Sequence, residues 1–192
     1  MRMKRLSDLC LAVACTAVLV GCSTTLVRED PRTIRLGDSG VACATTPLVK
    51  ELLAIRGTSV HAVQGIWKDH VFSAESVMKG EDGRFTAIFL APHMRLATIT
   101  LTPPHTITFD RARRIPSAFE PEYALFDLAV VNLPADRLRL ALGAGFTVSE
   151  ADGRRTVSAA GRPIAVRTAL PDGTVRYENL PLGYAYVLKE VR

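Results

Sequence analysis

The sequence predicts a mainly β fold with some helix (α+β), in which an antiparallel sheet of about ten strands curves toward a barrel or a sandwich and carries a helical insertion. Short segments that alternate apolar and polar residues recur about every ten residues on both sides of a helical stretch. Turn residues separate these segments, including the hairpin-favouring pairs Asp82-Gly83 and Asp152-Gly153. About ten strands are more than a flat sheet easily holds, so we expect curvature.

The first series of segments predicts five strands, and the second series predicts five more. The first five are expected over residues 60–67, 71–78, 85–90, 94–102 and 105–109. Lys79-Gly80-Glu81-Asp82-Gly83 has the composition of a hairpin turn between two of them. The second five are expected over residues 146–150, 156–160, 164–170, 175–180 and 184–191.

The helical insertion begins near Pro121, a favourable first residue for a helix. Apolar residues recur at helical spacing from there, and Asn132 and Pro134 end the pattern. A second, short helix is expected before Gly143 and Gly145. The first helix is apolar and of moderate length, so we expect it to pack on the sheet.

The first 22 residues have the features of a lipoprotein signal peptide. Three basic residues precede an apolar run over residues 9–20, which is too short to span a membrane. The run ends in Leu19-Val20-Gly21-Cys22, the pattern before which the signal is cut and whose cysteine receives a diacylglyceryl group. We therefore expect residues 1–21 to be removed and Cys22 to carry covalent lipid. Each buried methylene contributes about 0.8 kcal/mol, so two or three chains would hold the protein on a membrane.

Residues 22–45 are interpreted as a lipidated tether, and residues 46–192 as the folded domain, because the tether is polar and has no sustained period. Ser23 follows the lipidated cysteine in place of the Asp that retains lipoproteins in the inner membrane. We therefore expect the outer membrane, at its periplasmic face. Gly37-Asp38-Ser39-Gly40 also occurs around the serine of trypsin-like proteases, but no histidine precedes it in this chain, so a turn is the preferred interpretation.

Charge and cysteine content limit the classes of function. The formal net charge is +5, and about +3 without the signal peptide, with the densest basic run over residues 111–114. This is too weak and scattered to indicate nucleic acid binding; a solvated loop is the preferred interpretation of the run, and anionic lipid headgroups or a partner are the alternative. Cys43 is the single cysteine after Cys22, so a half-buried structural thiol is expected there.

We find no pattern that indicates catalysis, a cofactor or a metal. The four histidines, His61, His70, His93 and His105, are scattered without short metal-ligand spacing. Glu75, Glu81 and Asp82 could supply a carboxylate pair, but the last two lie in a turn. No motif supplies a nucleophile with a base and an orienting group, so we expect a protein that is not an enzyme and has no catalytic residues, no metal site and no cofactor besides the lipid on Cys22.

Aromatic side chains in the strands and in the first helix are candidates for the lining of an apolar cavity. For each of them, a place in the packed core is the alternative interpretation. The candidates are Trp67, Phe72, Phe85, Phe89, Phe109, Tyr123 and Phe126.

Several segments together resemble a known lipoprotein family. The segments are Gly65-Ile66-Trp67, Pro121-Glu122-Tyr123-Ala124-Leu125-Phe126-Asp127-Leu128, Leu133-Pro134 and Gly183-Tyr184, downstream of the lipidation motif. The chain resembles an uncharacterised family of lipoproteins associated with aryl polyene lipid biosynthesis, which is similar in plan to LolB, the outer-membrane receptor for lipoproteins. The resemblance covers roughly residues 46–192 and implies an unclosed antiparallel half-barrel, like LolB and LolA, with helices across its opening.

The resemblance also implies a function. The concave face of such a fold can shelter acyl or polyene chains, so we expect a lipoprotein of the outer membrane that binds a hydrophobic, lipid-linked cargo and helps transfer or insert it. Its partners would be the membrane, a lipoprotein or an aryl-polyene-type lipid, and a periplasmic carrier protein. A structural or assembly accessory that docks on a membrane protein through a sheet edge is the alternative. A hydrolase acting on envelope lipid or glycan is the least favoured class.

Overall fold

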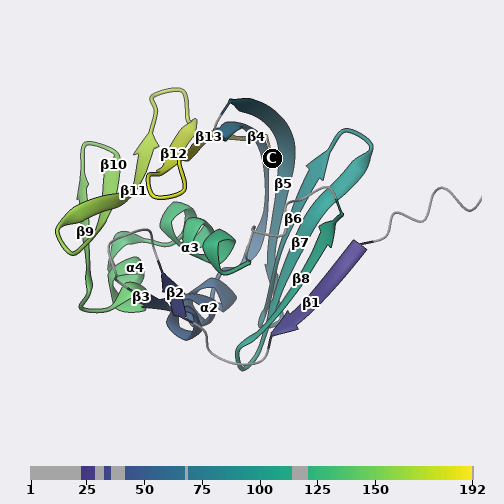
Figure 1. Ribbon diagram of the computed structural model, residues 1–192, viewed down its shortest axis with the longest axis horizontal. Coiled ribbons are helices and arrows are strands. Elements are labelled where there is room, and N and C mark those ends of the chain that lie inside the picture. The colour runs from purple at the N-terminus through teal and green to yellow at the C-terminus, as the bar shows by residue number, and fades with distance from the viewer. Residues whose placement is uncertain (1–22, 29–32, 36–41, 68, 114–120, 192) are drawn as a thin grey trace, which may run out of the picture.

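A computed structural model describes residues 23–28, 33–35, 42–67, 69–113 and 121–191. Within these residues the chain forms thirteen strands and three helices. Eleven strands make one sheet in the order β1-β8-β7-β6-β5-β4-β13-β12-β11-β10-β9, and β2 pairs with β3 in a separate ribbon. The large sheet curves around the helices without closing, so that β1 and β9 are its two edges (Figure 1). The predicted fold, an unclosed antiparallel half-barrel with a helical insertion, is confirmed.

All ten predicted strands are present, with ends that differ by a few residues. The first series comprises β4 (Gly57–Trp67), β5 (His70–Glu81), β6 (Arg84–Ala91), β7 (Met94–Thr102) and β8 (Thr106–Ala112). The second series comprises β9 (Phe146–Ala151), β10 (Arg154–Ala159), β11 (Arg162–Ala169), β12 (Val175–Asn179) and β13 (Tyr184–Glu190). Each series is a run of hairpins, and β13 pairs with β4 to join the two series into one sheet.

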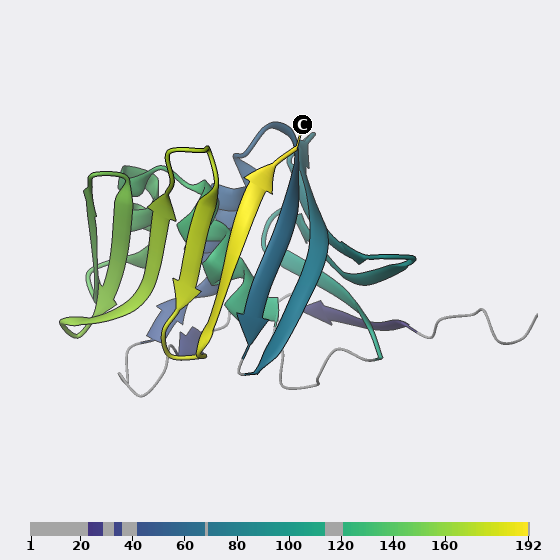
Figure 2. The ribbon, with the colours of Figure 1, turned by 90° about the horizontal axis from the view of Figure 1, so that it is seen from above.

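The helical insertion consists of α3 (Pro121–Asn132) and α4 (Ala135–Leu142), as predicted. Helix α3 is buried along most of its length and on nearly every side, because most of its residues are apolar and lie on all its faces. It lies in the hollow of the sheet, with the strands β9 to β12 on one side and β5 to β8 on the other (Figure 1). Seen at right angles, the helices lie behind the row of strands from β9 to β5 (Figure 2). Helix α3 lies between the two series of strands in the sequence, and in the fold the sheet that they form curves around it.

The segment before the first predicted strand contains secondary structure that was not predicted from the sequence. It forms β1 (Ser23–Arg28), β2 (Thr33–Arg35), β3 (Ala42–Ala44) and α2 (Thr45–Leu53). Strand β1 joins the large sheet beside β8 over six residue pairs. Strands β2 and β3 each bury only their central residue, Ile34 and Cys43, so they show too little alternation to be recognised as strands.

Some interpretations of the sequence fall on residues that the structure does not describe. The signal peptide over residues 1–21, the lipidated Cys22 and the Gly37-Asp38-Ser39-Gly40 turn lie outside the described residues. The described chain begins at Ser23, the first residue of β1.

Candidate functional site

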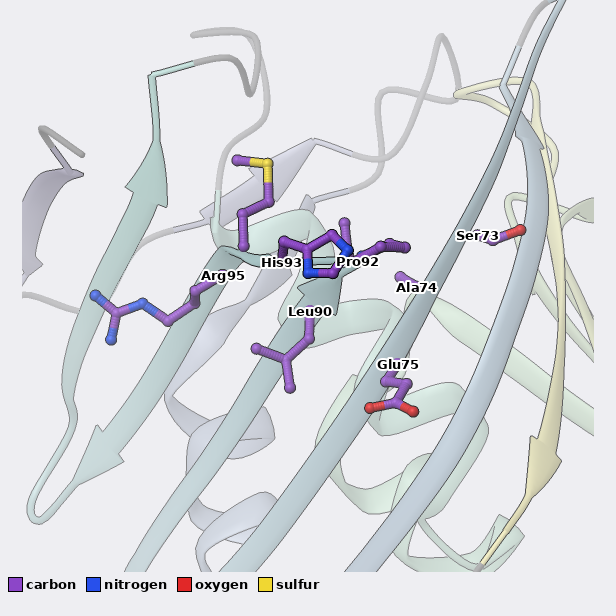
Figure 3. A pocket seen from close by; sticks show the side chains of 9 residues that line it. Ser73, Ala74, Glu75, Leu90, Pro92, His93 and Arg95 are labelled. Atoms are coloured by element: carbon purple, nitrogen blue, oxygen red, sulfur yellow. The ribbon is translucent and has the colours of Figure 1, made fainter. Parts of the chain in front are cut away.

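The sheet divides at one end, between β5 and the β6–β7 hairpin. Strand β5 pairs with β4 along all but its last residue, from His70 opposite Trp67 to Gly80 opposite Gly57. Its pairing with β6 begins only at Glu75, which lies opposite Leu90. Beyond this pair the β6–β7 hairpin diverges from β5, and the two form a fork (Figure 3).

The hairpin is irregular at the point where it leaves β5. The pairing of β6 with β7 shifts register between Phe89 and Leu90, which leaves Leu96 on β7 as the extra residue, and such a bulge bends the strand that carries it. Pro92 has no N–H to donate, and His93 has a positive φ of 66°. Proline followed by a positive φ is the pattern of a type II turn, whose twist splays the strands that it joins. Both irregularities lie in the part of the β6–β7 hairpin that extends past Glu75 and Leu90, the last residue pair between β5 and β6.

A cavity of about 660 Å³ lies in this fork. Its apolar lining comes from Ala74 on β5 and from Leu90, Ala91, Pro92 and Met94 on the β6–β7 hairpin. Its polar lining consists of Ser73, Glu75, His93 and Arg95. Figure 3 shows that Arg95 extends away from Glu75, so these two opposite charges do not close the fork. The lining thus combines apolar and polar side chains, a composition that suits an amphiphilic ligand.

The predicted cavity-lining aromatics divide into two groups in the structure. Phe85, Phe109 and Phe126 are fully buried in the core, and Phe89 and Tyr123 are partly buried against it. Trp67 and Phe72 instead remain 38% exposed, at the forked end of the sheet. Register places the five strand aromatics of the set on the concave face of the sheet, because cross-strand partners share a face. The structure therefore brings Trp67 and Phe72 toward the mouth of the half-barrel and packs the others in or against its core.

None of the predicted cavity-lining aromatics lines the fork itself, whereas Glu75 and His93 were considered only for a carboxylate pair and for metal binding. The signal that could have found the fork is Ala91-Pro92-His93-Met94, a hairpin turn with apolar residues where polar ones are usual. The position of β5 opposite this turn depends on pairing between strands, and periodicity alone does not reveal it.

A buried polar cluster holds α3 to the second series of strands. Asp127 on α3 accepts hydrogen bonds from the hydroxyls of Tyr177 on β12 and Tyr184 on β13. Asn179 donates to the same carboxylate at 3.1 Å and to the Tyr184 hydroxyl oxygen at 3.2 Å. Burial raises the pKa of Asp127 to about 6, although its three hydrogen bonds oppose that shift. Burial, with the nearby carboxylate, also raises the pKa of both tyrosines well above the usual value.

Two arginines satisfy the carbonyls at the end of α3. Arg155 on β10 is buried and donates to the carbonyl oxygens of Val130 at 2.9 Å and Leu133 at 2.6 Å. Its other amino group lies 3.2 Å from both carboxylate oxygens of Glu150. Arg167 on β11 donates to the Val131 carbonyl at 3.1 Å. The last turn of a helix leaves carbonyls without intrahelical partners and carries negative partial charge, so these arginines both cap and neutralise it.

Other candidate groups lie away from the fork or apart from one another. Cys43 on β3 is fully buried rather than half-buried, and burial raises the pKa of its thiol to about 12. His61 on β4 has a lowered pKa, chiefly because it is partly buried. In the part of the chain that the structure describes, no three His, Cys, Asp or Glu side chains are grouped so that they could hold a metal ion. The helices among the described residues are too short or too polar to cross a membrane.

Comparison with known proteins gives a family. A family model described as a protein of unknown function, DUF3261, matches residues 58–192. The chain belongs to the DUF3261 family. The match begins at the start of β4 and runs to the end of the chain, so the DUF3261 region contains both walls of the fork, α3 and the Asp127 cluster. A comparison with curated proteins gave no match for this chain.

Proposed function

We propose that this protein is a lipid-anchored carrier of the outer membrane that faces the periplasm and binds a hydrophobic, lipid-linked cargo in order to transfer or insert it. The observation that carries the proposal is the apolar cavity of about 660 Å³ in the fork between β5 and the β6–β7 hairpin. Its volume lies within the range of roughly 300–1,000 Å³ that is common for small-ligand sites. Trp67 and Phe72 extend the apolar surface at the same end of the concave face.

The organisation of the core supports a carrier whose mouth can adapt. Side chains on each of the four strands β10, β11, β12 and β13 donate hydrogen bonds to α3 and fix it to this half of the sheet. The other half contributes apolar side chains such as Phe85, Ile99 and Phe109 to the same core. Apolar contacts have no directional requirement, so this half can shift against α3 at a smaller cost than the hydrogen-bonded half. A long apolar chain that enters the fork would lie beside this adaptable half.

The chemistry of the cargo follows from the composition of the fork and from the resemblance of the chain. The apolar lining residues suit an acyl or polyene chain, and the polar ones, Ser73, Glu75, His93 and Arg95, suit a polar headgroup that carries both donors and acceptors. The resemblance to lipoproteins associated with aryl polyene lipids and to LolB favours a lipoprotein or an aryl-polyene-type lipid as cargo. A periplasmic carrier protein would be the partner that delivers or receives it.

The location rests on the signal peptide. Lipid on Cys22 would hold the protein on a membrane without any spanning helix, and Ser23 favours transfer to the outer membrane. The proposal assigns no catalytic residue, metal or cofactor other than this lipid. Its chemistry is binding and release.

A fluorescent fatty acid tests the proposal. Residues 23–192, produced without lipid, should bind the probe and increase its emission. Met94→Asp places a charge in the wall of the fork and should weaken binding by at least about tenfold, since burying a charge beside an acyl chain is costly. Leu140→Asp is the matched control, because Leu140 is 74% exposed on α4, and it should bind as the parent does.

The other outcomes separate the alternatives. Absence of probe uptake by the parent protein would contradict the carrier function. A stoichiometric membrane-protein partner captured without lipid would favour an assembly accessory that docks through an edge strand, β1 or β9. Cleavage of the probe would favour a hydrolase.

A further inference from the structure

The first described residues are part of the main sheet. Strand β1 pairs with β8 from Ser23 opposite Ala112 to Arg28 opposite Ile107. Leu26 packs against the core, and the Thr25 hydroxyl donates a hydrogen bond to Asp110 on β8. The chain that follows Cys22 is therefore tied into the sheet at once. Ser23, the first residue of β1, is bonded directly to Cys22, the residue proposed above to carry lipid.

Register fixes the end of the sheet at which β1 begins. A row of paired residues crosses six strands, through Thr24, Arg111, Ala97, Phe89, Ser76 and His61. Ser23 lies beyond this row on the same side as the β6–β7 turn and the β4–β5 turn. In both views the start of β1 and the β6–β7 turn lie on the same side of the molecule (Figures 1 and 2). The anchor would thus emerge at the forked end.

This end exposes an unusual amount of apolar surface. Among the described residues ten large apolar side chains are exposed, and half of them lie at the tips of the two hairpins. They are Ile66, Trp67, Val71, Phe72 and Met94. Val71 is 77% exposed at the start of β5. Clustered exposure of this kind is typical of a surface that meets a partner or a membrane.

We propose that β1 holds the lipidated N-terminus at the forked end of the sheet, and that the tips of the β4–β5 and β6–β7 hairpins rest on the bilayer that carries the anchor. This inference rests on the lipidation of Cys22 proposed above. It deepens the proposed function, because it places the mouth of the fork against the membrane. A cargo chain would then pass between bilayer and fork without crossing water.

A bilayer surface suits this end better than a protein partner does. The anchor would bring the hairpin tips to the lipid surface whether or not a protein is present. Tryptophan favours the membrane interface, and Trp67 lies at the β4–β5 tip. Arg95 and Arg113 are exposed at the same end and can meet lipid phosphates, while Asp69 in the β4–β5 turn has the opposite charge. The apolar tips and the anchor, rather than net charge, therefore carry the contact.

Trp67 is the only tryptophan of the chain, so its fluorescence reports on this end alone. Full-length protein that has been processed and lipidated in cells would be placed in vesicles of phosphatidylethanolamine and phosphatidylglycerol whose acyl chains carry bromine. We expect strong loss of Trp67 emission when the bromine is near the headgroup and weaker loss when it is near the chain end. Protein that stays on the vesicles with unquenched Trp67 would overturn the inference but leave lipidation intact. Protein that does not stay on the vesicles would instead contradict lipidation, and with it the anchored carrier.

Variants test the role of β1 and of the tips. A ten-residue Gly-Ser insert between Cys22 and Ser23 keeps β1 intact but lengthens the connection, and it should reduce quenching while membrane retention is unchanged. Thr25→Pro with Leu26→Pro disrupts β1 pairing and should have the same effect. Val71→Asp should also reduce quenching, whereas Leu140→Asp on α4 should not. Undiminished quenching in the insert variant would overturn the role of β1, and undiminished quenching in Val71→Asp would overturn contact by the hairpin tips.

Unlipidated protein separates membrane contact from cargo uptake. Residues 23–192 added to the same brominated vesicles should show little quenching, because the anchor is missing. Quenching as strong as that of the lipidated protein would mean that bound lipid, rather than the resting bilayer, reaches Trp67, and it would overturn the anchored geometry.

Discussion

Phe72 on β5 lies across Gly65 on β4, its cross-strand partner. A Cβ added at Gly65 would approach the ring carbon Cζ of Phe72 to 2.3 Å and the carbonyl oxygen of Ala185 to 2.9 Å. The ring therefore occupies the space that a side chain would take at position 65. This arrangement lets an aromatic residue cover the backbone at the mouth of the half-barrel while its other face remains exposed to solvent.

Gly65→Ala should displace Phe72 and strain the contact of β4 with β13. Forcing a methyl group into a filled site costs roughly 1–3 kcal/mol, so we expect a free energy of unfolding that is lower by this amount in urea titrations. Gly145→Ala is the control, since Gly145 is exposed and does not have a positive φ. Equal stability of the two variants would show that Phe72 does not depend on the glycine.

Asp127 should make stability depend on pH. Its pKa is about 6 in the folded protein against 3.8 for the free side chain, because burial disfavours the charge. The folded state therefore holds the proton more tightly, and its stabilising effect is complete below pH 3.8 and is lost as pH rises through about 6. The shift corresponds to about 3 kcal/mol at most. Urea midpoints measured from pH 4 to 7 should fall less steeply in Asp127→Asn than in the parent.

The exposed carboxylate Asp136 gives the control for this pH dependence. Asp136→Asn, in the first turn of α4, makes the same chemical change on an exposed side chain and controls for the loss of a carboxylate as such. If the urea midpoint of Asp127→Asn falls with pH as steeply as that of the parent protein, groups other than Asp127 cause the pH dependence.

Features of the fold and of the site that depend on neighbouring residues could be predicted from the sequence, whereas features that depend on residues far apart in the chain could not. Strands such as β5 and β6 are local patterns, and they were predicted correctly. The hairpin turn predicted over residues 79–83 is confined to Asp82-Gly83, because β5 continues to Glu81. The Asp127 cluster joins residues at least fifty positions apart, so no local pattern reveals it. Helix α2 was missed because it is only nine residues long and lacks a side-chain cap. The fork was missed because it arises where β6 stops pairing with β5.

The same reasoning explains the aromatic residues. Periodicity places Phe85 and Phe109 on the apolar face of their strands, but it does not show that α3 covers that face. Trp67 and Phe72 lie on the same face, beyond the buried part of the core, and remain exposed. The buried and the exposed aromatic residues therefore follow the same alternating pattern in the sequence, and they differ only in their position along the strands.

Arg155 should be essential for the docking of α3. Arg155→Met would leave the buried carbonyls of Val130 and Leu133 without this donor and separate Glu150 from its cation. Each unsatisfied buried acceptor costs about 1–3 kcal/mol, so the loss in unfolding free energy should be at least about 2 kcal/mol. Arg154→Met, an exposed neighbour on the same strand, should change stability by less than about 0.5 kcal/mol. Calorimetry of both variants compares the two sites, and a similarly small loss in Arg155→Met would contradict the capping role.

Cys43 should be unreactive in the folded protein. The thiolate is the reactive form, and burial raises the thiol pKa to about 12. Residues 23–192 contain no other cysteine, so alkylation by iodoacetamide reports on this site alone. We expect slow labelling in buffer and rapid labelling in urea. Rapid labelling of the native protein would show that the β2–β3 ribbon opens readily.

The most direct test of the carrier function is the lipid that the protein holds. Residues 23–192 with a cleavable secretory signal would be produced in the periplasm of cells that make the native cargo, purified without detergent and extracted for mass spectrometry. We predict a co-purified amphiphile with a long acyl or polyene chain, in near-equimolar amount, that is lost in Met94→Asp and retained in Leu140→Asp. Parent protein that carries no such lipid, and that takes up none when it is offered, would contradict the account.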